Sequence, residues 1–443
     1  MAYSPALEKL FKKQKIEPGT RIKITRNDAE VFEGLLLPRI ESGDKESVIV
    51  KLDTGYNVGI KHSTGVKIER LPGAIAKLAV FEKAEFQKNK NLPSISVVAT
   101  GGTIASRVDY RTGGVHMLLS PEQILATVPE LADFVNVKNV TSPFRLASED
   151  MGPKQWMEIA KETAAELNDG AKGVIVTHGT DTLHYTSAAL SFLLKGRKPV
   201  AVVGAQRSPD RASFDGAMNL VCGAHYAASD FGEVAVVMHG TPNDDFCFAH
   251  RGTKVRKMHT SARNAFKSVN AKPLAKIWSD GKIDKMNTDA KMREEEKVTV
   301  EGRFDERVAL LKVFPGSDPA VLDWYVSKGM RGIVIEGTGL GHLPTQPLEK
   351  KKSWLPAVKH AVEKGVVVAV ASQCLHGRTN DFVYTNLRLL KEAGAVHVDD
   401  TLPETALVKL GWLLGSEKHD ERVRELLRMN FAGEINERSQ ENE

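Results

Sequence analysis

The chain has 443 residues, of which 42% are hydrophobic and 26% charged, and these fractions exclude a largely disordered protein. The net charge of +5 is too small over this length to identify a nucleic-acid binder. The three cysteines, Cys222, Cys247 and Cys374, lie too far apart for a zinc ribbon or a disulfide framework. Because no apolar run approaches the ~20 residues of a membrane helix, we expect a soluble, cytoplasmic protein.

The first 72 residues are rich in short, β-branched runs separated by turn residues such as Asn27-Asp28 and Thr54-Gly55. These runs lie at 21–25, 31–37, 47–52, 57–60 and 65–71. Five short strands at nearly regular spacing predict a small closed β-barrel domain over residues 1–72. The lysine-rich residues 73–93 that follow are predicted to be a linker.

From residue 94 the pattern changes to continuous apolar runs that alternate with amphipathic segments. The runs lie at 94–100, 173–177, 199–204, 233–238, 307–313, 331–337 and 365–371. The amphipathic segments lie at 153–168, 182–195, 214–228, 353–364 and 403–415. This alternation predicts an α/β fold with parallel sheets covered by helices on both faces. The charged stretch 284–306 is predicted to link a large α/β domain at 94–283 to a smaller one at 307–443.

Ligands of open parallel sheets bind beyond the carboxyl ends of the strands, so the loops at these ends are the first place to look for chemistry. The first such loop, residues 100–106, begins with Gly101 and Gly102, which allow a sharp turn and place the Thr103 hydroxyl in the crevice. The loop lacks the lysine of a phosphate-binding loop and the GxGxxG pattern, so nucleotide binding is weakly supported. A structural turn and a catalytic role both stay open here.

The second loop places Thr180 and Asp181 at the start of the next predicted helix. Helix capping would explain one of these side chains, but two hydroxyls, a carboxylate and a glycine exceed what a cap requires. Two interpretations are also open for Lys254, further along the chain. A single loop lysine is usually a solvated charge, whereas a lysine beside Thr180 and Asp181 could move a proton for a hydroxyl nucleophile.

Ser148 and Glu149 precede the predicted helix at 153–168. One interpretation is that Ser148 or Asp150 caps this helix and Glu149 is a surface charge. The alternative is that both residues bind the charged ends of an amino-acid substrate.

Six motifs together resemble the L-asparaginase/glutaminase family. They are ATGGTIAS at 99–106, THGTDTLHYTS at 177–187, GAQRSPDRASFDGAMNL at 204–220, RGTKVRK at 251–257, IVIEGTGLGHLP at 333–344 and SQCLHGRTNDFVY at 372–384. The resemblance covers residues 94–415 and implies the two-domain asparaginase fold. With the N-terminal barrel included, the architecture is similar to the D subunits of archaeal glutamyl-tRNA(Gln) amidotransferases.

This resemblance implies a role for each candidate residue. Thr103 is expected to be a nucleophile toward the side-chain amide. Thr180, Asp181 and Lys254 are expected to form a hydroxyl–ammonium–carboxylate relay, and the order in which the two threonines act stays open.

The resemblance further implies that Ser148, Glu149 and Asp181 bind the α-carboxylate and α-ammonium of the substrate. The family also has a mobile lid with a tyrosine. Tyr110 is the tyrosine available here, but it lies only seven residues after Thr103, closer than the family pattern.

The implied reaction converts glutamine, or asparagine, and water into the acid and ammonia through a threonyl acyl-enzyme. A separate amidating subunit, of the E type, would use the ammonia to convert Glu-tRNA(Gln) into Gln-tRNA(Gln). ATP and Mg²⁺ would bind to that partner, and this chain is expected to bind no cofactor or metal. The chain is expected to form a homodimer within a heterotetramer. The alternative is an autonomous L-asparaginase/glutaminase with an appended barrel. An RNA-binding barrel beside an inactive body ranks third, because the strands of the barrel offer few aromatic side chains for base stacking.

Overall fold

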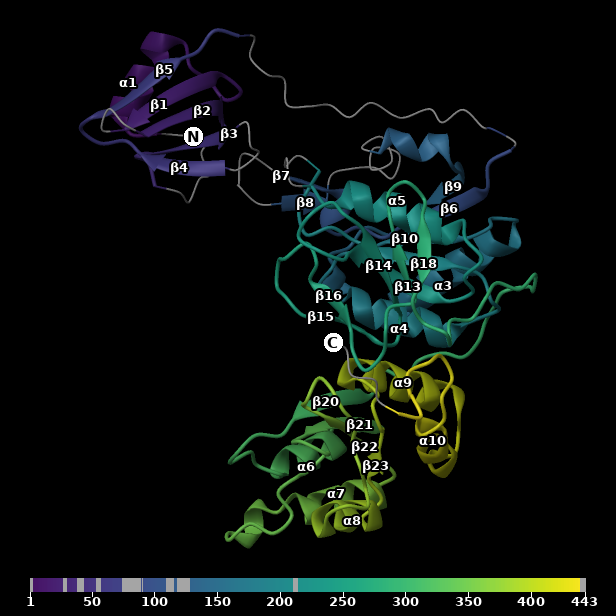
Figure 1. The fold of residues 1–443 in the computed structure, drawn as a ribbon. Helices are drawn as coiled ribbons and strands as arrows, with labels where there is room; N and C mark the ends of the chain where they lie inside the picture. The colour runs from purple at the N-terminus through teal and green to yellow at the C-terminus, as the bar shows by residue number, and fades with distance from the viewer. Residues whose placement is uncertain are drawn as a thin grey trace.

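A computed structural model describes residues 3–26, 30–37, 44–52, 57–73, 89, 91–108, 115–117, 128–209 and 214–438. Figure 1 shows three parts in chain order: a small N-terminal sheet domain in purple, a large α/β domain in blue and teal, and a second α/β domain in green and yellow. None of the helices in these ranges is long and apolar enough to cross a membrane.

The N-terminal domain is an antiparallel sheet of five strands with one helix. Its elements are α1 (Pro5–Gln14), β1 (Arg21–Arg26), β2 (Glu30–Leu36), β3 (Ser47–Leu52), β4 (Asn57–Lys61) and β5 (Val66–Arg70). Alternate residues of β1, including Ile22 and Ile24, face a core that Leu7 and Phe11 of α1 complete. The order β4-β3-β2-β1-β5 confirms the five predicted strands. In the described residues β4 and β5 are not hydrogen-bonded to each other, so the expected closed barrel is open at that position.

The large α/β domain has an eight-stranded sheet in the order β18-β17-β14-β13-β12-β10-β6-β9. Its strands are β6 (Ser94–Ala99), β9 (Asn136–Thr141), β10 (Val174–Thr177), β12 (Val200–Val203), β13 (Val234–His239), β14 (Cys247–Arg251), β17 (Ala275–Ile277) and β18 (Ile283–Lys285). The strands from β9 to β13 are parallel, and β14, β17 and β18 continue the sheet in antiparallel fashion.

Helices cover both faces of this sheet, as the apolar strands predict. Helices α3 (Pro153–Asn168) and α4 (Leu183–Leu193) pack on one face, where Val98, Val176 and Val202 belong to the same core. Helix α5 (Gly216–Ala227) packs on the opposite face. Shorter elements complete the domain: η1 (Thr103–Ala105), β7 (Ser106–Val108), β8 (Val115–Met117), η2 (Pro129–Asp133), η3 (Ser148–Asp150), β11 (Leu194–Lys195), β15 (Val255–Lys257), β16 (Phe266–Ser268) and β19 (Thr299–Val300).

The second α/β domain has a parallel sheet in the order β20-β21-β22-β23. Its elements are β20 (Val308–Lys312), α6 (Ala320–Ser327), β21 (Gly332–Gly337), η4 (Lys350–Lys352), α7 (Trp354–Glu363), β22 (Val367–Ser372), α8 (Thr385–Glu392), β23 (Val396–His397), α9 (Pro403–Ser416) and α10 (Asp420–Leu427). Helix α9 lies between the two α/β domains, where Trp412 stacks on Phe192 of α4 with ring centroids 5.5 Å apart (Figure 1). The two domains therefore share an apolar core.

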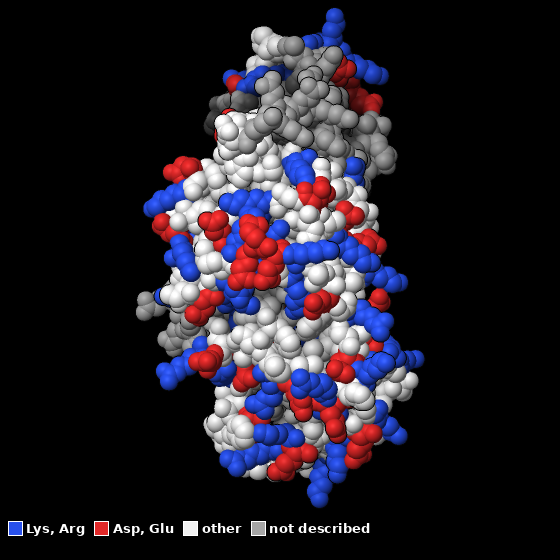
Figure 2. Space-filling view, turned by 90° about the vertical axis from the view of Figure 1, so that its right-hand side faces the viewer, with Lys and Arg blue, Asp and Glu red and all other residues white. Residues whose placement is uncertain are grey.

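The five predicted helices match α3, α4, α5, α7 and α9. Helices α1, α6, α8 and α10, of eight to ten residues each, were not predicted from the sequence. The charged stretch 284–306 packs on the large domain. There the side-chain amide of Asn168 forms hydrogen bonds with both the N–H and the C=O of Val298. On the face of the molecule that Figure 2 shows, lysine and arginine side chains are mixed with carboxylates over both α/β domains, in keeping with the small net charge.

Candidate active site

Two predicted loops lie side by side at the carboxyl ends of β6 and β10. The backbone N–H and the hydroxyl of Thr100 both donate to the carbonyl oxygen of Thr177, at 3.2 and 2.8 Å. A Cβ atom at Gly102 would lie 2.3 Å from the nitrogen of Gly179, and Gly102 has φ of +80°. Only glycine allows the two backbones to approach this closely. The next residue, Thr103, opens η1 and is half-buried against this contact.

The loop with Ser148 meets the same edge of the sheet. The hydroxyl of Thr182 donates to the carbonyl oxygen of Ser148 at 2.6 Å, and a Cβ atom at Gly179 would lie 2.8 Å from the Ser148 Cβ. Ser148 is buried, whereas Glu149 is exposed. The structure thus brings together three of the four predicted segments.

Neither alternative based on helix capping is observed. The N-cap residue of α4 is Thr182, whose side chain makes no capping hydrogen bond, and the N-cap residue of α3 is Gly152. Thr180 and Asp181 therefore do not cap α4, and Ser148 does not cap α3; its Oγ instead accepts from the backbone N–H of Thr182 at 3.4 Å. The start of α4 nevertheless gives this edge a partial positive charge, which favours a developing oxyanion.

Lys257 is the lysine that reaches Thr180 and Asp181. Its Nζ atom donates to the hydroxyl oxygen of Thr180 at 2.9 Å and to Oδ1 of Asp181 at 2.6 Å. The side chain of Lys257 is 9% exposed and that of Asp181 is 66% exposed. The ammonium therefore links a buried hydroxyl to a carboxylate that faces solvent, an arrangement that can transfer a proton to or from the hydroxyl.

The expected position of Lys254 beside Thr180 and Asp181 is wrong. Lys254 is fully buried, and its Nζ atom contacts Oδ2 and the carbonyl oxygen of Asp400, each at 2.9 Å. Burial lowers the pKa of Lys254, and the Asp400 carboxylate opposes this effect. The motif RGTKVRK contains both lysines, but only Lys257 belongs to β15, and Lys254 lies in the bend that precedes this strand. The second lysine of the motif is the signal that could have identified Lys257 as a candidate.

Two buried histidines beneath the loop also escaped the sequence-based prediction. His178 lies 2.7 Å from the Gly179 carbonyl oxygen through Nδ1 and 2.9 Å from the Thr186 hydroxyl through Nε2. Because a carbonyl can only accept, Nδ1 carries the proton and Nε2 accepts from the hydroxyl. Burial lowers the pKa of His178 to about 4. Burial and the nearby cations Arg256 and Lys257 lower the pKa of His184 to about 3. Both rings are therefore neutral at pH 7, and His178 contacts the loop through the Gly179 carbonyl oxygen.

The predicted lid residue, Tyr110, lies outside the described residues. The same is true of Gly113 and Gly114, the expected hinge of the lid.

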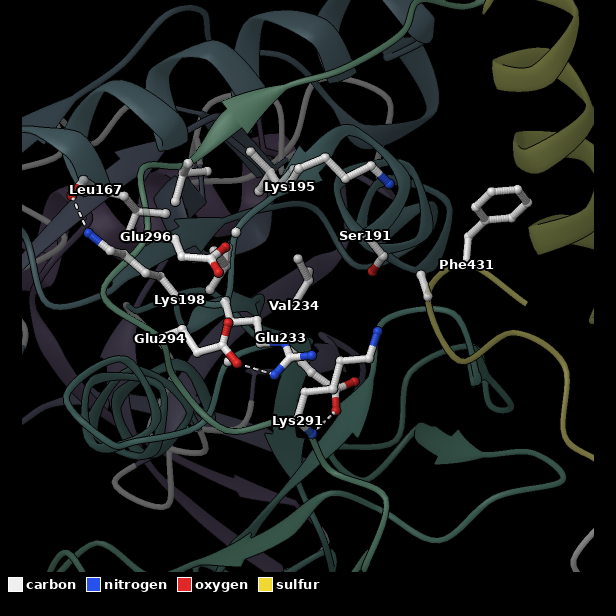
Figure 3. Close-up of a pocket in the computed structure, with 17 residues that line it drawn as sticks. Leu167, Ser191, Lys195, Lys198, Glu233, Val234, Lys291, Glu294, Glu296 and Phe431 are labelled. Atoms are coloured by element: carbon white, nitrogen blue, oxygen red, sulfur yellow. Dashed lines mark hydrogen bonds and ion pairs between the residues drawn. The ribbon is translucent and has the colours of Figure 1, made fainter. Parts of the chain in front are cut away.

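A separate cavity of about 290 Å³ lies at the opposite end of the sheet (Figure 3). Its lining includes Val200 and Val234, the first residues of β12 and β13. Glu233 in its wall is paired with Arg251 at 2.7 Å, and Glu294 is paired with Arg197. This cavity is therefore distinct from the edge that holds Thr180.

Three family models match the chain. The "Asparaginase, N-terminal" model matches residues 94–291, the "Glutaminase/Asparaginase C-terminal domain" model matches 307–427, and the "GatD N-terminal domain" model matches 16–71. Together they cover the three parts seen in Figure 1.

Curated relatives match almost the whole chain. The D subunit of the glutamyl-tRNA(Gln) amidotransferase from Pyrococcus furiosus is 48% identical over 433 residues, 97% of each chain. Proteins of the same name from Methanothermobacter thermautotrophicus and Methanopyrus kandleri are 42% and 44% identical and cover 99% and 98% of this chain, and 98% and 94% of their own.

Solved structures match the two α/β domains. The L-asparaginase of Thermococcus kodakarensis has a TM-score of 0.68 at 28% identity, covering 77% of this chain and 99% of its own. L-asparaginase I from Vibrio cholerae has a TM-score of 0.66 at 28% identity, covering 78% of this chain and 99% of its own. The two-domain asparaginase fold predicted from the motifs is thus confirmed.

Proposed function

Because the chain belongs to the family of glutamyl-tRNA(Gln) amidotransferase D subunits, we propose that it is the amidohydrolase component of such an enzyme. It releases ammonia from the side-chain amide of glutamine, or of asparagine, for the conversion of Glu-tRNA(Gln) to Gln-tRNA(Gln). The observation that carries this proposal is the contact of Lys257 with Thr180 and Asp181, beside the loop of Thr103. These are the residue types that an amide hydrolase with a threonine nucleophile requires.

The first half of the reaction forms an acyl-enzyme. A threonine oxygen attacks the amide carbon and its proton passes to a base, which donates a proton to the amide nitrogen as the carbon–nitrogen bond breaks, so that ammonia leaves. Thr180 has a proton acceptor in direct contact, because the unprotonated amine of Lys257 would accept from its hydroxyl at the observed 2.9 Å. The Asp181 carboxylate stabilises the ammonium that results. In the second half, water attacks the threonyl ester and releases the acid.

Substrate binding is assigned to the same edge. Ser148, Glu149 and Asp181 are proposed to hold the α-carboxylate and α-ammonium, with the two carboxylates on the ammonium. Both carboxylates are exposed at the mouth of the site. A lid that includes Tyr110 is proposed to close over the substrate.

The ammonia is proposed to pass to an amidating partner subunit that binds ATP and Mg²⁺, in the cytoplasm, within a heterotetramer built on a dimer of this chain. The names of the full-length relatives and the match of residues 16–71 to the GatD N-terminal domain support this over an autonomous asparaginase. The two solved asparaginases are covered over 99% of their own length but leave 23% and 22% of this chain unmatched.

The test is ammonia release from glutamine and from asparagine by the full chain, alone and with its partner subunit and Glu-tRNA(Gln). Low activity alone that rises with the partner supports the amidotransferase, whereas rapid asparagine hydrolysis by the chain alone favours the autonomous enzyme. We expect Lys257→Met to lower kcat by about 10²- to 10⁴-fold, the usual contribution of a general acid or base. Lys359→Met, at an exposed lysine of α7, is the control. Full activity of Lys257→Met would refute the relay.

A further inference from the structure

Residues 253–256, directly before Lys257, are held by the second α/β domain. Lys254 forms its ion pair with Asp400 in the segment that leads into α9, and both side chains are fully buried. The hydroxyl of Thr405 donates to the carbonyl oxygen of Thr253 at 3.1 Å. The strand that carries the site lysine is thus attached to a domain that supplies none of the site residues predicted from the sequence.

A second ion pair follows two residues along the same strand. Arg256 lies 3.0 Å from Oε1 of Glu404, whose side chain is 8% exposed. Glu404 lies in the first turn of α9, close to Asp400 in the sequence. The carboxylates of one short segment, 400–404, therefore bind Lys254, directly before β15, and Arg256, within β15.

This alternation determines where Lys257 points. Val255 is buried in the core with α4, and Lys257 reaches Thr180 at the start of that helix. Lys254 and Arg256 face the second domain instead. Since side chains alternate along β15, holding Arg256 toward the second domain keeps Lys257 on the other side, and the Lys254 pair anchors the start of the strand.

Asp400 is itself fixed from a third direction. Asn436, in the C-terminal segment, donates its backbone N–H to Oδ1 of Asp400 at 3.0 Å and its side-chain amide to Oδ2 at 2.8 Å. The same segment accepts a hydrogen bond from the Thr253 hydroxyl through the carbonyl oxygen of Ala432 at 2.9 Å. The C-terminal segment therefore contacts both the Asp400 carboxylate and the residue that precedes Lys254.

We propose that Asp400 and Glu404 are positioning residues for Lys257, acting through Lys254 and Arg256. The inference rests on the proposed function, in which Lys257 serves amide hydrolysis. A lysine side chain has four rotatable bonds. Whether Lys257 can form a hydrogen bond with the Thr180 hydroxyl therefore depends on the position of β15, the strand that carries this lysine. A displacement of about 1 Å can lower a rate about 100-fold.

The experiment compares Glu404→Gln with Asp305→Asn in the full-length chain with its partner subunit. Asp305 is a matched control: its side chain is 10% exposed and pairs with Arg331 at 3.1 Å and Arg307 at 2.7 Å, both in the second domain, rather than with a residue of β15. We expect Glu404→Gln to lower kcat for glutamine hydrolysis about 10- to 100-fold with KM changed less than about twofold. Asp305→Asn is expected to keep the kcat of the parent chain. Glu404→Asp is expected to recover part of the loss.

If circular dichroism shows that the Asp400→Asn chain is folded, we expect this variant also to lower kcat while KM changes little. Equal kcat in Glu404→Gln and Asp305→Asn, or a loss confined to KM, would overturn the inference. If Lys257→Met is inactive while Glu404→Gln is fully active, the positioning role fails and the proposed function stands. If Lys257→Met is fully active, the relay itself fails.

Discussion

Lys254 and Lys257 lie three residues apart and belong to two contrasting regions of the molecule. Lys254 lies in the interface between the two α/β domains, where both side chains of its ion pair with Asp400 are fully buried. Lys257 sits at the edge of the sheet, where its partner Asp181 is 66% exposed. A fully buried pair cannot exchange its partner for a substrate without a large cost, whereas a pair open to solvent can. The first region therefore provides structure and the second provides chemistry.

The largest effect expected on stability follows from Lys254→Met. This change leaves the Asp400 carboxylate buried without its cation, and breaking a buried pair from one side costs about 3–5 kcal/mol. Urea unfolding measures the loss, and Lys254→Met combined with Asp400→Asn is expected to recover most of it. Lys257→Met should cost less than about 1 kcal/mol, because Asp181 keeps its contact with water. Equal losses in the two single variants would remove the distinction between the regions.

The sequence predicted the fold because its signals are local. Continuous apolar runs such as 173–177 and 365–371 specify buried parallel strands, and the glycines at 101 and 102 specify a sharp turn at a strand end. The convergence of Thr103 and Thr180 followed from one topological rule about where ligands bind parallel sheets, whereas Ser148 was assigned to the same site only through the family resemblance.

The choice between the two lysines could not be predicted in the same way. Lys254 and Lys257 both lie in one short motif, and only the positions of Asp400 and Asp181 distinguish them. Those carboxylates are 146 and 76 residues away in the chain, so tertiary packing decides the outcome. The closed barrel expected for the N-terminal domain is a similar case. Its closure requires β4 to pair with β5, and this depends on the curvature of the whole sheet rather than on the sequence of either strand.

The next largest effect is a dependence of stability on pH, and it compares the two α/β domains. Burial lowers the pKa of His178 at the catalytic edge and of His397 in the second domain to about 4 each. An unfolded histidine has a pKa of about 6.5, so between pH 6.5 and 4 the unfolded chain binds more protons than the folded one. The free energy of unfolding is therefore level above pH 6.5 and falls by about 1.4 kcal/mol per pH unit for each such histidine as the pH drops toward 4.

Urea unfolding at pH 7, 6 and 5 measures this slope. His178→Gln and His397→Gln should each reduce it by about one proton, and the double variant by about two, since the residues lie in different domains. A slope that is unchanged in His178→Gln would mean that this ring is protonated in the folded chain. The loop at Gly179 would then lack the neutral acceptor that receives the Thr186 hydroxyl.

The smallest effect concerns the close approach of the loops, and Gly59 in the N-terminal domain serves as its control. A Cβ atom at Gly179 would lie 2.8 Å from the Ser148 Cβ and 2.9 Å from its Oγ, whereas one at Gly59 would meet no described heavy atom within 4 Å beyond its chain neighbours. Gly179→Ala should cost about 1–3 kcal/mol of stability, and Gly59→Ala less than about 0.5 kcal/mol. Because the added methyl group displaces Ser148, Gly179→Ala should also raise KM for glutamine. A loss of stability with KM unchanged would mean that Ser148 supports the loop without binding the substrate.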